Sequence, residues 1–334
     1  MSKKILAKLT KKITIAVDLM GGDDYPDVRL DTILAILKSQ ENIIFRVFVS
    51  KSYLDTIVAK ILPLDKQCIT FIACERSVSM DESPFSALRQ KRKSSLSQAI
   101  KDVADINADI CVTAGNTGAM VALSKHWFNP MVDCDKPVLA TLLPSRSRRS
   151  LLLDVGATIE ASADDLYNFA RLGSAWQHVF SGIEKPEICL LNVGLEQNKG
   201  VDAVKQADVM LKELNLNYKG YCEGTHLFKG YCDVICCNGF VGNITLKSCE
   251  SMASFIKNDS DDPTKSTIWQ KIKKGMRIVE PDKYNGALLL GFDGLVIKSH
   301  GACNAQSFDA ALHQAYTMAQ KPIIKKMTKL LENN

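Results

Sequence analysis

The sequence has no uninterrupted apolar run of the ~18 residues that a membrane-spanning helix requires, so it predicts a chain that does not cross a membrane. It also has neither the GxGxxG fingerprint of dinucleotide-binding sites nor the Walker pattern of nucleotide-binding loops. Basic residues form no stripe interleaved with aromatic side chains, and aromatic residues make up only 7% of the chain. These absences argue against a nucleotide cofactor and against a nucleic-acid partner.

Paired metal-ligand motifs are missing as well. The chain has 11 cysteines, an odd number, and most of them stand inside apolar segments. No CxxC or HxxxH motif accompanies the nearest candidate set, Cys232, Cys236 and Cys237. Without a signal peptide, this pattern is typical of reduced thiols in the core of a cytoplasmic protein. The sequence therefore predicts no metal and no other cofactor.

What the chain does contain is a globular composition with a mild positive charge. Of its 334 residues, 46% are hydrophobic and 24% are charged, which is enough for a sizeable core. The net charge of +5 suits an anionic substrate or an acidic partner. Arg146, Arg148 and Arg149 form either a solvated loop or a docking site for such a partner. We expect residues 1–12 to be a basic N-terminal extension and residues 13–334 to form a single α/β catalytic domain.

Strand-like and helix-like segments alternate from residue 13 onward. Short apolar runs predict strands, and apolar residues at helical spacing predict helices. Their alternation is typical of an α/β fold with a mostly parallel sheet and helices on both faces, in which ligands bind at the carboxyl ends of the strands. The predicted strands are 13–18, 43–49, 68–74, 110–114, 138–143, 151–154, 187–192, 233–237, 288–294 and 295–299, and the predicted helices are 28–37, 54–61, 163–180, 203–214 and 305–318. Further helices are predicted after the serine pair 94–95, from residue 119 onward and after the turn 238–243.

The turn after the strand at 110–114 is the strongest candidate for a binding site. It reads Gly115, Asn116, Thr117, Gly118 and opens a helix. Glycines let backbone amides approach an anion closely, and a helix N-terminus adds partial positive charge. The alternative is an ordinary strand-to-helix turn capped by Thr117. Two similar turns follow other predicted strands, and their candidates for substrate and phosphate binding are Gly21, Gly22, Asp23, Gly242 and Lys247.

Residues 250–280 are expected to form a helical hairpin around the polar segment 258–265. Its second half presents Ile268, Trp269 and Ile272 as an apolar stripe beside several lysines. Such a stripe packs into the core or against a second copy of the chain. A basic amphipathic helix with an interfacial tryptophan can also lie on an anionic bilayer. The sequence leaves both possibilities open.

Seven segments of the chain together carry a family resemblance. They are AVDLMGGDDYP (16–26), SALRQKRKSS (86–95), VTAGNTGAM (112–120), LLDVGA (152–157), LLNVGLEQNKG (190–200), CDVICCNGFVGNITLKSCE (232–250) and YNGALLLGFDGLVIKSHGACNA (284–305). The most specific parts are NGFVGNITLK (238–247) and VIKSHG (296–301). From about residue 13 to the end of the chain, the segments resemble, in the same order, those of the acyl-ACP:phosphate acyltransferases of bacterial phospholipid synthesis, the PlsX type.

This resemblance implies that inorganic phosphate attacks the thioester of a fatty acyl chain on acyl carrier protein, which gives acyl phosphate and free carrier. Such an enzyme must hold an anion, aim it at the carbonyl and stabilise the developing oxyanion. The groups expected near the reacting centre are Lys298, His300 and Asn243. The resemblance further implies a fold like that of isopropylmalate dehydrogenases and phosphotransacetylases, and a homodimer. It also implies a cytoplasmic location, with peripheral contact at the inner face of the plasma membrane, where a glycerol-3-phosphate acyltransferase takes the product.

The chain departs from the family pattern at several polar positions. The family usually has an acid at the position of Lys93 and Asn at the position of Thr158. It usually has Asn at Tyr221, Arg at Thr225 and Asp at Asn238. We expect these changes to affect rate or substrate preference more than fold. Two alternative functions therefore stay open. One is a phosphate acetyltransferase-like enzyme that uses acyl-CoA, and the other is a non-catalytic acyl-binding scaffold.

Overall fold

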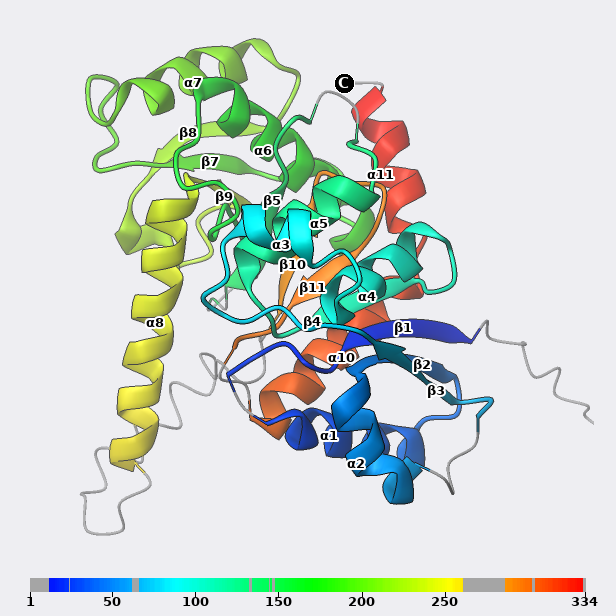
Figure 1. Cartoon of the computed structure of the whole chain (residues 1–334). Coiled ribbons are helices and arrows are strands. Elements are labelled where there is room, and N and C mark those ends of the chain that lie inside the picture. The colour runs from blue at the N-terminus through cyan, green and yellow to red at the C-terminus, as the bar shows by residue number, and fades with distance from the viewer. Residues whose placement is uncertain are drawn as a thin grey trace, which may run out of the picture.

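A single 11-stranded sheet forms the centre of the computed structural model (Figure 1). The strands lie in the order β3-β2-β1-β4-β11-β10-β5-β6-β9-β7-β8. The structure describes residues 12–23, 25–61, 66–131, 134–143, 145, 148–260, 286–301 and 304–332.

Most neighbouring strands of the sheet are parallel. The antiparallel pairs are β10 with β11, β10 with β5, and β5 with β6. The strands are β1 Ile13–Asp18, β2 Ile43–Ser50, β3 Ile69–Cys74, β4 Ile110–Thr113, β5 Val138–Leu143, β6 Ser150–Leu153, β7 Ile188–Leu191, β8 Tyr218–Cys222, β9 Val234–Cys236, β10 Ala287–Leu290 and β11 Val296–Lys298.

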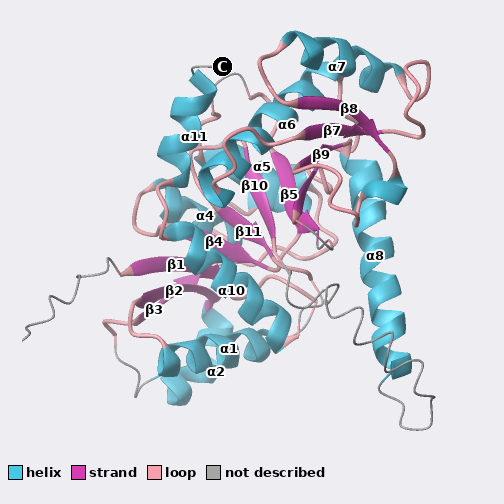
Figure 2. Cartoon of the chain, turned by 180° about the vertical axis from the view of Figure 1, so that it is seen from behind, coloured by secondary structure: helices cyan, strands magenta, loops and turns pink. Residues whose placement is uncertain are grey.

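Helices cover both faces of the sheet (Figure 2). A π-helical turn, Gln177–Ser181, continues α6, and a short 3₁₀ turn, Gly224–His226, follows β8. The helices are α1 Pro26–Ser39, α2 Lys51–Ile61, α3 Pro84–Gln90, α4 Ser95–Ala104, α5 Thr117–Trp127, α6 Ala163–Trp176, α7 Asp202–Glu213, α8 Gly239–Ser260, α10 Ala305–Ala319 and α11 Ile323–Glu332.

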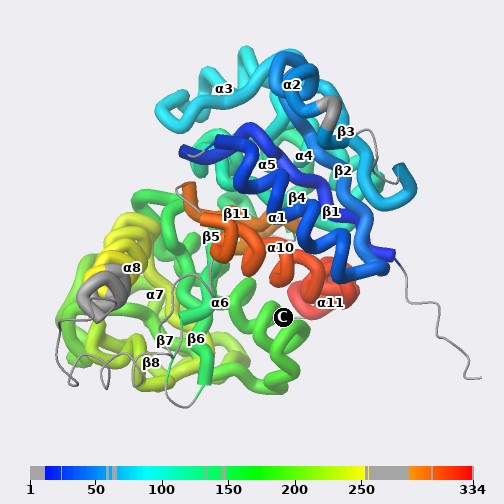
Figure 3. The backbone as a smooth tube through the Cα atoms, turned by 90° about the horizontal axis from the view of Figure 1, so that it is seen from below, coloured from blue at the N-terminus to red at the C-terminus, as the bar shows by residue number. Residues whose placement is uncertain are grey.

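Alternation along the buried strands explains the two helical layers. In β1, Ile15 and Val17 join the core cluster that contains residues of α1 and α10, whereas Ala16 joins the cluster that contains residues of α4 and α5. Successive strand side chains point to opposite faces, so a continuous apolar run needs cover on both sides. Figure 3 shows α1 and α10 on one side of β1 and α4 and α5 on the other.

The predicted α/β class with a mostly parallel sheet is confirmed. Three elements were not predicted: α3, β8 and α11. The predicted hairpin at 250–280 is described only in its first part, where α8 continues through the start of the polar segment to Ser260. Its second half, with Ile268, Trp269 and Ile272, lies outside the described residues.

Candidate functional site

The turns after β1, β4 and β11 meet at the same edge of the sheet, because these three strands are parallel neighbours. A Cβ added to Gly21 would lie 2.6 Å from the backbone nitrogen of Gly115, so a side chain at this position would push the two backbone segments apart. The amide of Asp23 donates to the carbonyl of Gly301 at 2.9 Å. Gly21 thus allows two of the predicted binding turns to pack directly against each other.

A buried hydrogen-bond chain holds the central turn. The amide of Gly115 donates to the Thr113 hydroxyl at 2.9 Å, and that hydroxyl donates to the Asp18 carboxylate at 2.8 Å. Burial raises the pKa of the Asp18 carboxyl. The sequence analysis missed Asp18 and Thr113, although both occupy the last position of a predicted strand or the one before it.

A cavity of about 330 Å³ opens beside these turns, between β5, α8 and the residues that follow β11. It has a polar part and an apolar part, as is usual for sites that bind small organic ligands. The polar part is lined by Asp23, Thr117, Asn243, Lys247, Glu250, Lys298 and His300. The apolar part is lined by Leu139, Leu142, Leu143, Val155, Phe228 and Leu246. The cavity therefore gathers predicted residues from all three Gly turns and from β11.

Lys298 and His300 reach the cavity from the end of β11. The Lys298 ammonium donates to the carbonyl of Ala114 at 3.1 Å and also to the carbonyl of Ser299, which holds it against the central turn. His300 Nε2 lies 3.5 Å from a carboxylate oxygen of Glu250. The contact with Glu250 raises the pKa of His300, while burial opposes the shift. Glu250 thus favours the protonated imidazole.

Glu250 was missed by the sequence analysis, although helical spacing could have found it. Asn243, Lys247 and Glu250 stand at i, i+4 and i+7 of α8, which places them on one helical face. All three line the cavity. One face of α8 therefore supplies an amide, a cation and a carboxylate to the same site.

The start of α8 is fixed against the turn that follows β6. A buried Asp154 carboxylate accepts hydrogen bonds from the amides of Leu139, Ala157 and Thr158, at 3.0, 3.0 and 2.6 Å. A Cβ added to Gly242 would lie only 1.8 Å from the Asp154 carbonyl oxygen. The absence of a side chain at this position lets α8 pack directly on the turn, which brings its polar face to the cavity.

The family of the chain follows from comparison with known proteins. A family model described as "Fatty acid synthesis protein" matches residues 13–326. The phosphate acyltransferase of Bartonella henselae is 36% identical over 333 residues, which span 95% of this chain and 92% of that protein. The phosphate acyltransferase of Rhizobium etli is 38% identical over 328 residues, with 94% of each chain covered. The chain belongs to the phosphate acyltransferase family. The resemblance seen in the seven sequence segments is confirmed.

Solved structures with little sequence identity share the fold. A phosphotransacetylase from Streptococcus pyogenes superposes with a TM-score of 0.62 at 15% identity, covering 92% of this chain and 94% of the other. A branched-chain phosphotransacylase from Enterococcus faecalis gives a TM-score of 0.59 at 12% identity, covering 92% and 99%. The expected phosphotransacetylase-like fold is confirmed by these structures.

Asn116 and Gly118 of the central turn contact the segment 80–84 of the chain. The Asn116 side chain caps α5 by accepting from the amide of Ala119 at 2.9 Å, so Asn116 and not Thr117 is the N-cap. Its amide group donates to the carbonyls of Met80 and Glu82 at 2.7 and 2.9 Å. A Cβ on Gly118 would lie 2.7 Å from the Pro84 ring. Of the four turn residues, Thr117 lines the cavity, and Gly115, Asn116 and Gly118 do not.

The departures from the family pattern lie outside the cavity lining as far as the structure describes it. Lys93 pairs with Glu75 at the surface at 3.0 Å. Thr158 contributes backbone groups, because its carbonyl accepts from Gly239 at 2.8 Å. Asn238 accepts from the amide of Val241 at 2.9 Å, a capping contact that an aspartate would make equally. Lys93, Thr158 and Asn238 thus each make a local contact within the chain, away from the cavity.

Arg148 of the predicted basic cluster is a structural residue. Its guanidinium pairs with Glu187, lies 3.1 Å from an Asp233 oxygen, and donates to the Gly230 carbonyl at 2.9 Å. Docking of an acidic partner at this cluster is therefore not supported by the position of Arg148. Arg146 lies outside the described residues.

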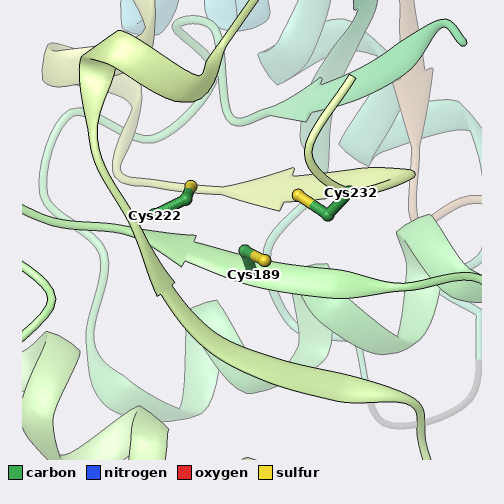
Figure 4. Close-up of side chains that lie close together, drawn as sticks. All are labelled: Cys189, Cys222 and Cys232. Atoms are coloured by element: carbon green, nitrogen blue, oxygen red, sulfur yellow. The ribbon is translucent and has the colours of Figure 1, made fainter. Parts of the chain in front are cut away.

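Within the described part of the chain, three cysteines form the group of side chains best arranged to hold a metal ion. They are Cys189, Cys222 and Cys232 (Figure 4). The set differs from the Cys232, Cys236 and Cys237 set weighed from sequence, because β7 lies between β8 and β9 in the sheet. None of the three lines the cavity described above.

Proposed function

We propose that the protein is a phosphate acyltransferase that converts a fatty acyl thioester of acyl carrier protein and inorganic phosphate into acyl phosphate and free carrier. The observation that carries this proposal is the two-part cavity. Lys247, Lys298 and His300 supply positive charge at its polar part, and the leucines of β5 supply its apolar wall. A fatty acyl thioester and phosphate together need such a combination.

In the proposed reaction, phosphate binds near Lys247, Lys298 and the N-terminus of α5 beside Thr117. One phosphate oxygen attacks the thioester carbonyl carbon. As the new C–O bond forms, the C–S bond breaks, and the carrier thiolate leaves with the bonding electron pair and then takes up a proton. Protonated His300 stabilises the developing oxyanion, with Asn243 as a neutral hydrogen-bond donor beside it. No step requires a covalent intermediate on the protein.

Two competing functions from the sequence analysis are less well supported. A non-catalytic acyl-binding scaffold has no need for a cluster of cations that includes Lys298 and His300, and the altered family positions lie away from that cluster. A phosphotransacetylase-like enzyme that uses acyl-CoA shares the chemistry. The thioester carrier alone separates it from our proposal.

The experiment measures phosphate-dependent release of carrier thiol from palmitoyl acyl carrier protein, with palmitoyl-CoA as a second substrate. We expect turnover of the carrier substrate, and a loss on the order of 10²-fold in Lys298→Met. The matched control is Lys93→Met, at an exposed lysine away from the cavity. Absence of turnover with both thioesters would contradict the enzyme proposal, and turnover with palmitoyl-CoA alone would favour the second candidate.

We further propose that α8 carries the contact with a second copy of the chain. Ile244, Met252 and Phe255 are 50%, 59% and 59% exposed, and α8 extends away from the other helices (Figures 1 and 2). A large exposed apolar stripe marks an interaction surface. No helix among the described residues has the length and apolarity to cross a bilayer. We place the protein in the cytoplasm, with peripheral contact at the plasma membrane and transfer of product to a membrane glycerol-3-phosphate acyltransferase.

A Phe255→Glu variant tests the homodimer. We expect it to shift from dimer to monomer in sedimentation analysis, with Glu213→Gln on α7 as a control that stays dimeric. A variant that remains dimeric but no longer floats with anionic vesicles would assign the stripe to the membrane instead. A variant that changes neither property would remove both roles from this face of α8.

A further inference from the structure

Cys189, Cys222 and Cys232 bring three sulfur atoms together in the interior, away from the cavity. Cys189 lies in β7, Cys222 ends β8, and Cys232 stands two residues before β9. These strands are neighbours in the order β9-β7-β8. All three residues have no exposed surface, and their sulfur atoms all lie within 4.8 Å of one another (Figure 4). Residues of β7 and β8 and of the segment just before β9 thus meet at one point.

The three thiols are protonated when nothing is bound to them. The contact with Cys222 and then burial raise the pKa of Cys189, and the contact with Cys189 and then burial raise the pKa of Cys232. A raised pKa disfavours the thiolate form at neutral pH, so these thiols are poor nucleophiles. A thiophilic metal ion can displace such protons, because the thiolate is the form that binds.

The surroundings of Cys232 are built to hold it in place. Ser150 donates from its hydroxyl to the Cys232 carbonyl at 2.6 Å. Arg148 donates to the carbonyls of Gly230 and Tyr231, at 2.9 and 2.6 Å. These contacts fix the chain just before the sulfur. Metal sites depend on such outer contacts, which orient the ligands.

The charge of Arg148 also acts on the thiols. Its guanidinium favours the thiolate of Cys232, although Glu187 and Asp233 share that charge. A nearby cation reduces the cost of burying the negative charge that a metal–thiolate group carries. The remaining negative charge is smaller with a divalent ion than with a monovalent ion.

We propose that Cys189, Cys222 and Cys232 form a structural site for one thiophilic d¹⁰ metal ion of the Zn(II) or Cu(I) class. Thiolate sulfur is the ligand type that selects these ions. Within the described residues the group consists of three ligands, and each is fully buried. Three thiolates complete the coordination of a three-coordinate Cu(I) ion, whereas Zn(II) takes a fourth ligand in most structural sites; either ion would join β7, β8 and β9. Binding forms a metal–sulfur bond at each thiolate and releases one proton from each thiol that becomes a thiolate.

The test titrates the full, reduced and chelator-treated chain with Zn(II), and in a second arm with Cu(I) without oxygen, against a chromophoric competitor. We expect one ion per chain in at least one arm, and tighter binding at higher pH because protons are displaced. Cys222→Ser should weaken binding at least tenfold. The matched control is Cys111→Ser, a fully buried cysteine of β4, which should bind as the wild type does.

A second measurement on the wild-type chain does not depend on the folding of any variant. The mass of the metal complex under non-denaturing conditions should equal that of the chain plus one ion minus the displaced protons. A complex without proton loss, a wild-type chain that binds no ion in either arm, or a Cys222→Ser variant that binds as tightly as wild type would each overturn the proposal. The three thiols would then be core packing only.

Discussion

Replacing Gly242 by alanine tests whether the position of α8 sets the geometry of the site. Alanine has the higher helix propensity by about 1 kcal/mol, so the substitution alone would stabilise α8. The added Cβ, however, would lie 1.8 Å from the Asp154 carbonyl oxygen, where real Cβ atoms keep at least 3.0 Å. The helix must therefore withdraw by about 1.2 Å, because a backbone carbonyl cannot rotate away as a side chain can. Overpacking of this kind costs about 1–3 kcal/mol and occasionally more.

We expect the contact to outweigh the propensity, so that the net free energy of unfolding of the Gly242→Ala protein falls by up to about 2 kcal/mol. The midpoint of thermal unfolding should fall by a few degrees, since each kcal/mol is worth about 2–4 °C in larger domains. A displacement of this size at Asn243, Lys247 and Glu250 should lower kcat/KM on the order of 10²-fold. Both quantities are measured by thermal denaturation and by the carrier-release assay.

The matched control is Gly224→Ala, because a Cβ at Gly224 meets nothing within 4 Å and its backbone is not left-handed. This variant should unfold and turn over as the wild type does. If Gly242→Ala were as stable and as active as Gly224→Ala, or more stable than wild type, the argument that close packing at Gly242 positions α8 would be refuted.

Three further predictions concern neighbouring groups and the need for metal. Glu250→Gln removes the contact that raises the pKa of His300, so activity that requires protonated His300 should be lost at a lower pH than in wild type. The control is Glu213→Gln, and a Glu250→Gln pH–rate profile that matches those of the control and the wild type would contradict this prediction. Asn116→Ala removes the cap of α5 and the link to Met80, so it should cost about 1–3 kcal/mol of stability and raise the phosphate concentration needed for turnover. An unchanged unfolding midpoint would show that these contacts contribute nothing to stability. Dialysis against a chelator should leave turnover unchanged, and activity restored by added magnesium, or by added zinc in a Cys222→Ser variant, would mean that catalysis needs a metal.

The parts of the fold that could be predicted are those whose sequence pattern is local. β1 and β4 are short apolar runs, and burial on both faces leaves little else that such runs can form. β8 was missed because Tyr218–Cys222 contains Lys219 and Gly220 and is only partly buried near the edge of the sheet. α11 was missed although Ile323, Met327 and Leu331 recur every four residues and face the core. There the signal was present and was overlooked.

The candidate site was predictable only in part, because its composition depends on how strands are ordered. The sequence indicated Lys298 and His300 through their place after a strand. It did not indicate that β10 and β5 lie between β11 and β6, each antiparallel to both of its neighbours. This arrangement brings the leucines of β5 to the cavity wall. Strand order is a long-range property, so no local pattern in Val138–Leu143 distinguishes a cavity wall from ordinary core.

The glycines show why a motif alone does not separate ligand binding from close packing. Gly21, Gly118 and Gly242 all invite a role in phosphate binding, yet a Cβ at each would meet protein atoms at 2.6, 2.7 and 1.8 Å. The same sequence signature thus arises when a backbone must approach a ligand and when it must approach another turn or helix. In this chain close packing of the backbone also shapes the cavity, because the contact at Gly242 brings Asn243 and Lys247 to its lining. Loss of activity in a glycine variant therefore identifies a binding residue only when the unfolding midpoint is unchanged.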